Sequence, residues 1–371
     1  MKQRTSVLLL IPHLGGGGAE KVFALLAREL SRQAYELHLG IVTSSGALWD
    51  AHGPDVTIHT LGAARVRYAA LPLLALVRRL KPDAIVSGMF HLNFLVLLLR
   101  PLFPRATRIL VRQNGTVSAS LAQDALPVYT RLLYRLLYRR ADRVICQTDA
   151  MANDLARELA LDADRMVVLP NPLDVDSIRA AVQHCPDKWT GAGPHLLAVG
   201  RLSREKGFDL LFEAFPSVRK SFPTADLLIA GAGPEEAALR GRCRALGLEA
   251  VVRFAGYVEH PVENFPGAAL FVLPSRHEGM PNALLEAAAA GLPIVALPAS
   301  GGVTGLLRGQ PGVWLAPQVS AAALGMTLLQ ALSELRPGQR FTHAFIEPFR
   351  MERATRAYQE LIDATIEERK P

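Results

Sequence analysis

The sequence SRHEGMPNALLEAAAAGLPIVA, residues 275–296, is the most informative about the fold, because it places a turn and a helix between two predicted strands. Short apolar runs at residues 269–273 and 294–297 flank the helix, and such runs are typical of parallel strands buried on both faces. A turn at residues 279–282 starts the helix, and a glycine followed by a proline ends it. The stretch therefore predicts one strand–helix–strand unit of a parallel sheet.

The start of this predicted helix is suited to a phosphate. Free N–H groups and the helix dipole converge where a strand's C-terminal end feeds a helix. Two carboxylates, Glu278 in the turn and Glu286 in the helix, belong to the same stretch. Because carboxylates repel phosphate, we expect them to hold other groups, and the hydroxyls of a sugar or a ribose fit that role.

Length and composition bound the protein class. The 371 residues fit two domains of about 150–200 residues each, and a hydrophobic content of 50% excludes a disordered chain. No apolar run reaches the roughly 18 residues that span a bilayer. The run at residues 7–11 is too short for a signal peptide and is interpreted as the first strand. Cys146, Cys185 and Cys243 are scattered, which predicts buried reduced thiols and a cytosolic compartment.

Strands and helices alternate through both halves of the chain. The pattern runs from residues 7–11 to residues 167–169 and restarts at residues 195–199. Repeated strand–helix units predict an α/β fold with doubly wound parallel sheets. Two prolines and a loose composition predict a linker at residues 170–193, and a last helix is expected at residues 349–366.

The excess positive charge lies in the first half of the chain. Residues 1–185 hold 22 Lys/Arg against 15 Asp/Glu, and the remainder holds equal numbers of each. Such a field favours an anionic partner, namely membrane lipid, a pyrophosphate-bearing acceptor or nucleic acid, unless it reflects an ordinary arginine-rich composition. Nucleic acid is disfavoured because this half lacks interleaved aromatic residues and a recognised module.

Two predicted helices of this half are strongly basic. Residues 126–140, LPVYTRLLYRLLYRR, carry a leucine stripe at 132, 133, 136 and 137 beside arginines at 131, 135 and 139. Two interpretations remain open: a core-facing helix with a solvated basic face, or a helix lying on a membrane surface with its arginines on lipid phosphates. The helix at residues 71–80, also flanked by arginines, has the same two interpretations.

Two loops of the first half follow predicted strands and carry candidate ligand-binding residues. The glycines at residues 15–18 permit close backbone approach to a ligand, or form a flexible turn, and they do not match the G-x-G-x-x-G fingerprint. Gln113 and Asn114 follow the strand at residues 109–112, at the end where ligands bind in such sheets.

Two cations stand out in the second half. Arg201 and Lys206 are five residues apart in a strand-to-helix loop, where they would clamp a diphosphate, although an ordinary surface pair is the alternative. With Glu278 and Glu286 on hydroxyls and the amides of residues 279–283 on phosphate, they describe a nucleotide-sugar pocket. Positive charge would stabilise the departing diphosphate without a metal or another cofactor. The D-x-D pattern at residues 174–176 lies in the predicted linker, so we predict no metal there.

Four motifs together resemble the retaining glycosyltransferases of family 4, which have the GT-B fold. They are G-R-x-x-x-x-K-G at residues 200–207, E-G-x-P-N-A-x-x-E at 278–286, N-P-x-D at 171–174 and G-G-A-E at 17–20. The resemblance extends over nearly the whole chain. It implies two facing Rossmann-like domains: an N-terminal acceptor-binding domain at residues 1–180 and a C-terminal nucleotide-sugar-binding domain at residues 190–348. It also implies a C-terminal helix, residues 349–371, that crosses back to the N-terminal domain.

The resemblance also implies roles for single residues. Arg201 and Lys206 would bind the donor phosphates, Glu278 would contact the transferred sugar, and Glu286 would contact the ribose. Of these, Arg201, Lys206 and Glu278 are the predicted catalytic residues. The full set of predicted donor-binding residues is Gly16, Gly17, Gly200, Arg201, Lys206, Gly279, Met280, Pro281, Asn282, Ala283 and Glu286.

The sequence departs from the family pattern on the acceptor side. Many relatives have a histidine after the strand at residues 109–112, where this sequence has Gln113 and Asn114, as in the S-E-R-N variant of the family. An acid–base role there is therefore in doubt. His91, together with the two amides, is an acceptor-side candidate, and a buried structural histidine is the alternative interpretation.

The predicted function is transfer of a sugar, with retention, from a nucleotide-sugar donor to a glycan or polyprenyl-diphosphate-linked acceptor in cell-surface polysaccharide synthesis. A UDP-sugar is favoured, and no metal is required. A GT-B epimerase and a non-catalytic nucleotide-sugar-binding protein are the alternatives. The expected location is the cytoplasm, peripheral to the inner membrane through the basic N-terminal domain.

Overall fold

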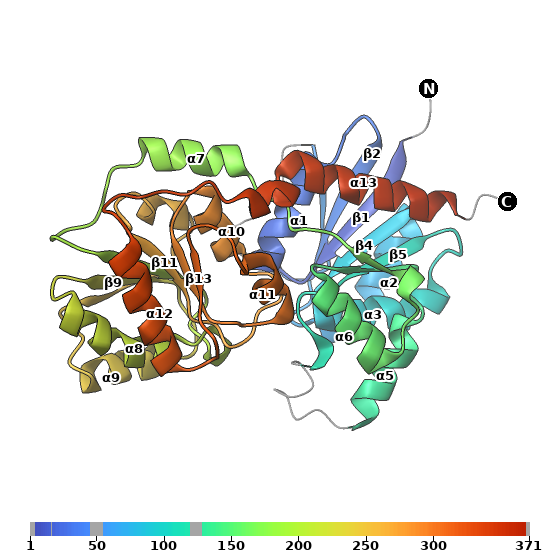
Figure 1. Ribbon diagram of the computed structural model, residues 1–371. Coiled ribbons are helices and arrows are strands. Elements are labelled where there is room, and N and C mark those ends of the chain that lie inside the picture. Colours follow the sequence, from blue (N-terminus) through green and yellow to red (C-terminus); the bar gives the residue numbers. More distant parts are fainter. Residues whose placement is uncertain (1–3, 16, 45–54, 119–127, 369–371) are drawn as a thin grey trace. The chain divides into compact units, whose positions relative to one another are not determined.

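The computed structural model describes residues 4–15, 17–44, 55–118 and 128–368 (Figure 1). Its internal contacts divide the chain into two units, which are described separately below. The first unit comprises Met1–Pro172 and Met351–Pro371, and the second comprises Leu173–Arg350. Each unit is a parallel sheet covered by helices on both faces, as the alternating sequence pattern predicts.

The first unit contains a seven-stranded sheet in the order β3-β2-β1-β4-β5-β6-β7, in which neighbouring strands pair in parallel. The chain builds outward in one direction from β1 and then restarts on its other side at β4, which makes a topological switch point between β1 and β4. The strands are β1 (Thr5–Ile11), β2 (Tyr35–Ile41), β3 (Thr57–Thr60), β4 (Ala84–Gly88), β5 (Arg108–Arg112), β6 (Arg143–Cys146) and β7 (Met166–Val168).

Helices cover both faces of this sheet, and β1 shows why. Its residues Leu8 and Leu10 pack on one face, whereas Val7, Leu9 and Ile11 pack on the other, as the two-residue period of a strand requires. The first face is covered by α2 (Ala70–Leu80), α3 (Phe90–Leu99), α5 (Val128–Tyr138) and α6 (Asp149–Leu159). The second is covered by α1 (Gly18–Glu29) and α13 (Met351–Glu367).

The last helix, α13, packs in the core of the first unit although it follows the second unit in the chain. Tyr358 and Ile362 are each 1% exposed and belong to the same apolar cluster as β1. The Tyr35 hydroxyl donates a hydrogen bond of 2.7 Å to the Asp363 carboxylate and so ties β2 to this helix. Burial and this carboxylate together raise the pKa of Tyr35.

The second unit repeats the plan with six parallel strands in the order β10-β9-β8-β11-β12-β13. The strands are β8 (His195–Val199), β9 (Asp226–Ala230), β10 (Val252–Gly256), β11 (Leu270–Leu273), β12 (Ile294–Ala296) and β13 (Val313–Leu315). One face carries α8 (Phe208–Ser221), α9 (Glu236–Ala245) and α12 (Ala321–Glu334). The other carries α7 (Val175–His184), α10 (Asn282–Ala289) and α11 (Gly301–Leu307).

The linker predicted at residues 170–193 is wrong in its first part, because residues 175–184 form helix α7. The Asp174 side chain accepts a hydrogen bond from the Ser177 N–H and caps this helix. Val175 is buried and Ile178 packs against the same core, so the contacts assign the helix to the second unit. The predicted boundary at 180–190 is therefore displaced to 172–173, because two prolines before a capped helix were interpreted as the start of a linker.

Of the leucine stripe predicted for residues 126–140, only Leu137 faces the core. Residues 126 and 127 lie outside the described residues. In α5 the tyrosines Tyr134 and Tyr138, one turn apart, are 0% exposed and make tilted and edge-on contacts with the aromatic rings of α3. Leu132, Leu133 and Leu136 are instead 57%, 42% and 53% exposed. The aromatic rings bury more apolar area than leucines do, and they decide which face packs.

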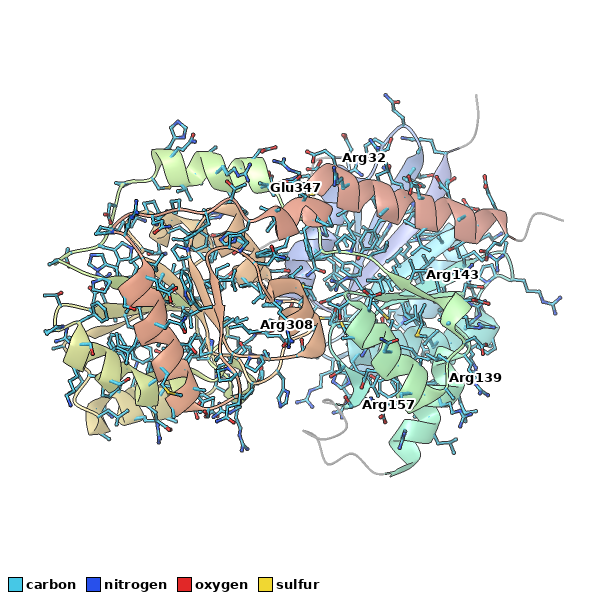
Figure 2. All side chains as sticks on the ribbon, in the orientation of Figure 1. Arg32, Arg139, Arg143, Arg157, Arg308 and Glu347 are labelled. Carbon is cyan, nitrogen blue, oxygen red and sulfur yellow. The ribbon has the colours of Figure 1, made fainter. Side chains whose placement is uncertain are left out.

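The surface arginines, the cysteines and the helix lengths relate to the predicted location in the cytoplasm beside the inner membrane. Arginines such as Arg139 and Arg157 lie on the surface of the first unit (Figure 2). Cys146 and Cys243 are buried free thiols, whereas Cys185 is only half-buried, contrary to the prediction for it. Among the described helices, none has the length and apolar character needed to cross a bilayer.

Candidate functional site

The switch point of the second sheet brings two loops of the predicted pocket together. β8 pairs with β11, and the chain leaves the two strands in opposite directions across the sheet. The loop after β8 covers residues 200–207, and the loop after β11 covers residues 274–281. Ligands of open α/β sheets bind at such a position, outside the carboxyl ends of the strands.

Lys206 and Glu278, one from each loop, form an ion pair. The Lys206 ammonium lies 2.7 Å and 2.8 Å from the two carboxylate oxygens of Glu278. The buried Ser275 hydroxyl donates a third hydrogen bond of 2.7 Å to the Oε1 atom of Glu278. The Glu278 side chain is 7% exposed and that of Lys206 is 24% exposed, so the ion pair is largely buried but can still be reached from solvent on the lysine side.

A second ion pair joins the same two loops. The Arg276 guanidinium donates two hydrogen bonds of 2.6 Å to the carboxylate of Asp209, in the first turn of α8. It donates a third to the carbonyl oxygen of Arg204, and the Arg276 N–H donates to the carbonyl of Glu205. Burial would raise the pKa of Asp209, but the bonds from Arg276 outweigh it and lower that pKa. We call Arg276 and Asp209 the loop clamp.

The loop clamp yields a prediction. Arg276→Met keeps an unbranched apolar side chain but removes the three hydrogen bonds of the guanidinium, two to Asp209 in α8 and one to the carbonyl of Arg204 in the loop after β8. We expect turnover to fall about ten- to 100-fold, because the Lys206–Glu278 geometry depends on both loops. Steady-state assays of sugar transfer would measure the loss.

A pH profile separates this role from a general loss of stability. Because the folded pKa of Asp209 is lowered, the pair contributes stability above the unfolded pKa of about 4, and this contribution is lost as pH falls. In the Arg276→Met variant the free energy of unfolding should therefore fall less steeply as the pH is lowered below about 4. Arg242→Met, which removes a more exposed pair with Glu213 on the same helix α8, serves as the control. Equal activity losses in both variants would contradict the clamp.

Glycines allow the backbone of the first loop to pack closely. A Cβ atom at Gly231 would lie 1.9 Å from the carbonyl oxygen of Gly200, and one at Gly233 would lie 2.3 Å from that of Leu202. The Leu202 N–H donates to the carbonyl of Ala232. The G-x-G at residues 231–233 therefore supports the loop after β8.

The other predicted donor-binding residues are arranged around the start of α10. This eight-residue helix begins at Asn282, directly after Pro281, which supplies no side-chain cap. Met280 is 9% exposed, and Glu286 is half-buried one turn into the helix. Gly279 and Ala283 are also half-buried. The backbone thus presents the first turn of a helix beside the Lys206–Glu278 pair, as an anion-binding site requires.

Arg201 is not part of these contacts. Its residue is exposed, and within the described ranges its guanidinium makes no hydrogen bond or ion pair. Gly200, before it, donates its N–H to the carbonyl of Ala230. Of the three predicted catalytic residues, the structure therefore joins Lys206 and Glu278 directly and leaves Arg201 available to a ligand.

The predicted residues of the first unit lie at the carboxyl ends of its strands. Gly16 lies outside the described residues, and Gly17 is the N-cap residue of α1. His91 in α3 is exposed, so the alternative of a buried structural histidine is wrong. Position 91 is the second residue of the helix and projects from it, whereas Asn93 is buried and donates to the carbonyl of Arg112 at 3.0 Å.

Gln113 and Asn114 belong to a buried polar network that the sequence did not predict. Its centre is Arg112, which is 0% exposed and donates to Tyr358 of α13, to Asn114 and to Asn171. Gln113 accepts a hydrogen bond of 2.8 Å from the Tyr138 hydroxyl. The arginine at the end of a buried strand was the available signal, because a buried cation needs several hydrogen-bond acceptors.

The D-x-D residues take structural roles. Asp174 caps α7, and Asp176 pairs with Arg350 at 3.2 Å. In the part of the chain that the structure describes, no group of three or more His, Cys, Asp or Glu side chains is placed to hold a metal ion.

Comparison with family models gives matches to both units. Residues 16–177 match the family described as Glycosyltransferase Family 4, and residues 193–334 match that described as Glycosyl transferases group 1. Together the two matches leave out only the start of the chain, a short connecting segment and the C-terminal region.

Single relatives and solved structures agree with these matches. An N-acetylgalactosaminyltransferase of Campylobacter jejuni, acting on N-acetylgalactosamine-N,N'-diacetylbacillosaminyl-diphospho-undecaprenol, is 26% identical over 77% of this chain and 79% of its own. The lipopolysaccharide core biosynthesis glycosyltransferase LpsE of Rhizobium meliloti is 25% identical over 94% of this chain and 97% of its own. The structure of Anabaena HepE in complex with UDP and glucose has a TM-score of 0.79 at 16% identity, covering 97% of this chain and 100% of HepE.

Proposed function

Because this chain belongs to the family 4 glycosyltransferases of the GT-B fold, we propose that it transfers a sugar with retention from a UDP-sugar to a lipid-linked glycan. The family membership makes it a glycosyltransferase of polysaccharide synthesis. The finer terms, which are the donor, the stereochemistry and the acceptor, are the proposal. The observation that carries it is the Lys206–Glu278 pair beside the start of α10 at the switch point.

The donor is assigned by charge and geometry. Lys206, Arg201 and the first amides of α10 would bind the diphosphate, Glu278 the transferred sugar, and Glu286 the ribose. The Arg201 guanidinium is exposed and has no ion pair among the residues that the structure describes. It can therefore bind an incoming phosphate without breaking such a pair, which supports this assignment. Similarity to a structure that holds UDP and glucose supports UDP as the nucleotide. Gly17, His91, Gln113 and Asn114 stay sequence-based predictions for the remaining contacts.

The Lys206–Glu278 ion pair also favours one mechanism for retention of the anomeric configuration. Glu278 accepts bonds from Lys206 and Ser275, which stabilises its charge and weakens it as a nucleophile. We therefore assign front-face attack: the acceptor oxygen bonds to the anomeric carbon as the bond to the diphosphate oxygen breaks. The acceptor proton passes to the departing diphosphate. Lys206 and Arg201 stabilise the charge that develops there, and we propose that no metal is needed.

One experiment tests the proposal. Thermal-shift screening of UDP- and GDP-sugars selects a donor, and transfer to a synthetic polyprenyl-diphosphate glycan is then followed in excess chelator. We expect an α-UDP-sugar to give an α-linked product. An inverted product, or a requirement for added divalent metal, would overturn the corresponding part of the proposal. Epimerisation of the donor without acceptor would show an epimerase, and stabilisation by donor without any turnover would show a binding protein.

A membrane-facing role of α5 belongs to the same proposal, because a lipid-linked acceptor lies at a membrane. Leu132, Leu133 and Leu136 are exposed, and Arg131 and Arg135 on the same helix are exposed beside them. Exposed leucines bordered by arginines suit the interface of an anionic bilayer.

Replacing the three exposed leucines by serine should reduce binding to anionic vesicles at least tenfold, because each leucine loses its apolar contact with the acyl chains. The unfolding midpoint should stay nearly unchanged, since these side chains are exposed. Co-sedimentation with phosphatidylglycerol vesicles measures the effect. Met326→Ser, a change at a 64% exposed apolar residue of the second unit, is the control, and equal binding by all variants would contradict a role for α5.

A further inference from the structure

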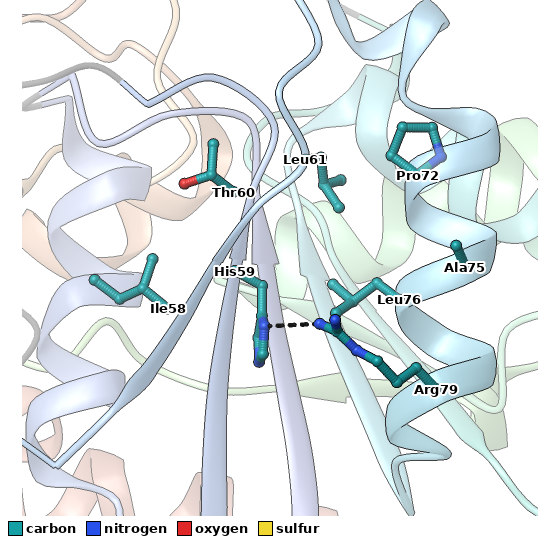
Figure 3. A pocket seen from close by; sticks show the side chains of 8 residues that line it. All are labelled: Ile58, His59, Thr60, Leu61, Pro72, Ala75, Leu76 and Arg79. Carbon is teal, nitrogen blue, oxygen red and sulfur yellow. Dashed lines mark hydrogen bonds between the residues drawn. The ribbon is translucent and has the colours of Figure 1, made fainter.

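A cavity of about 430 Å³ lies in the first unit between the edge strand β3 and helix α2 (Figure 3). Its volume is within the range of about 300–1,000 Å³ that is usual for small-molecule sites. The lining residues are Ile58, His59, Thr60, Leu61, Pro72, Ala75, Leu76 and Arg79. None of these takes part in the site of the second unit.

The polar end of the cavity is a chain of hydrogen bonds with a fixed direction. Arg79 Nη2 lies 3.3 Å from His59 Nδ1, and His59 Nε2 lies 3.2 Å from His38 Nδ1. Because a guanidinium only donates, His59 Nδ1 must accept, and its Nε2–H therefore donates to His38 Nδ1. Both imidazoles are then neutral. His38 Nε2–H points toward Glu36, whose Oε1 atom is 3.7 Å away.

The charge of the cavity is positive. Arg79 is the only formally charged side chain among the lining residues, and no Asp or Glu lines the cavity within the described ranges. Among the described residues the Arg79 guanidinium bonds to the neutral ring of His59 rather than to a carboxylate, so it retains donors for a ligand. Glu36, the carboxylate of this chain of bonds, is at the far end and is 57% exposed.

The cavity is separate from the predicted acceptor-side loop of the same unit. β3 is four strands away from β5 in the sheet order, a separation of about 19 Å at the usual strand spacing. His59 is in register with Gly40 of β2, and Gly40 with Leu10 of β1, so the cavity opens over the outer strands.

We propose that this cavity binds a phosphate ester, with the Arg79 guanidinium as its anchor beside the imidazole of His59. The apolar lining by Leu61 and Leu76, on the same face of the sheet as Arg79, accommodates the body of the ester. A soluble phosphate ester and the headgroup of an anionic lipid present the same chemistry. The site is independent of the sugar-transfer proposal.

Proton uptake should accompany binding. Burial lowers the pKa of both His38 and His59. The neighbouring ring of His38 and then Arg79 lower the pKa of His59 further, whereas at His38 Glu36 opposes the effect of burial and Arg79 adds to it. A bound phosphate next to Arg79 cancels the positive charge and favours the protonated imidazoles. The affinity for phosphate should therefore rise as pH falls from 7.5 to 6, and we expect a change of about threefold or more.

The test uses the full chain with its nucleotide site saturated with UDP, so that phosphate is not bound there. Binding of inorganic phosphate and of glycerol 3-phosphate is followed by NMR of the histidine rings at pH 6 and pH 7.5. Arg79→Gln should weaken binding about tenfold or more. Arg78→Gln is the matched control, because the neighbouring Arg78 is exposed, lies outside the cavity and donates to the Leu102 carbonyl. His59→Gln should keep part of the binding but lose its pH dependence.

A second experiment, with lipid vesicles, distinguishes a lipid headgroup from a soluble phosphate ester as the ligand. If phosphatidic acid vesicles bind in an Arg79-dependent way while the soluble esters do not, the ligand is a lipid headgroup. If the soluble esters shift the His38 and His59 resonances in an Arg79-dependent way, the ligand is a soluble phosphate ester. Equal behaviour of Arg79→Gln and Arg78→Gln with both kinds of ligand would overturn the proposal, as would phosphate affinity that is independent of pH in the wild-type chain.

Discussion

Replacing Glu278 by glutamine should lower the rate of sugar transfer about 10²- to 10³-fold while leaving UDP binding within a few-fold of the wild type. The amide keeps the shape of the side chain but removes the charge that two loops are built to hold: Lys206 at 2.7 Å and 2.8 Å, and Ser275 at 2.7 Å. Lys206, released from its partner, remains available to the diphosphate. Steady-state kinetics and calorimetric titration of UDP would separate the two effects.

The matched control for this variant is Glu263→Gln. Glu263 pairs with Lys188 at the same distance of 2.7 Å in the same unit, but both side chains are exposed, at 41% and 47%. That change should leave transfer within about twofold, since exposed ion pairs contribute little. Glu286→Ala should weaken both transfer and UDP binding, because its proposed partner is the ribose. Parallel losses of transfer and UDP affinity in Glu278→Gln would refute the assignment of Glu278 to the sugar.

Replacing Gly207 by alanine should destabilise the protein by about 3–5 kcal/mol and remove transfer activity. Gly207 has φ +64°, a conformation that costs an L residue roughly 1–2 kcal/mol, and its Cβ atom would lie 2.0 Å from the carbonyl oxygen of Pro274. Pro274 begins the loop that carries Glu278, so relieving the clash must move the two site loops apart. Urea unfolding gives the stability, and activity of the remaining folded protein gives the geometric effect.

The variant Gly247→Ala separates the cost of the left-handed backbone conformation from the cost of the clash with Pro274. Gly247 has nearly the same φ, +66°, but no atom lies within 4 Å of the added Cβ position. This variant should lose only about 1 kcal/mol and retain full activity. If Gly207→Ala and Gly247→Ala were equally stable and equally active, close packing of the loops after β8 and β11 would not be needed for function.

The sequence alone was sufficient for the architecture. Continuous apolar runs of five or so residues, each followed by a helical pattern, predicted parallel sheets because only strands buried on both faces have such runs. The motifs at residues 200–207 and 278–286 were placed correctly in loops at strand ends, since strand and helix are adjacent in sequence there. The family membership of the chain was likewise predicted from these motifs and is confirmed by the family-model matches.

The contacts between segments far apart in the chain, and the choice between two apolar faces, could be known only from the folded structure. Lys206 and Glu278 are separated by 72 residues, and no local pattern shows that they form a pair or that Arg276 holds Asp209 beside them. In α5, leucines and tyrosines both offered an apolar stripe, and packing against the rings of α3 buried the tyrosines. Periodicity in a sequence fixes which residues share a face, but the partner that covers a face comes from elsewhere in the chain, so only the folded structure selects it.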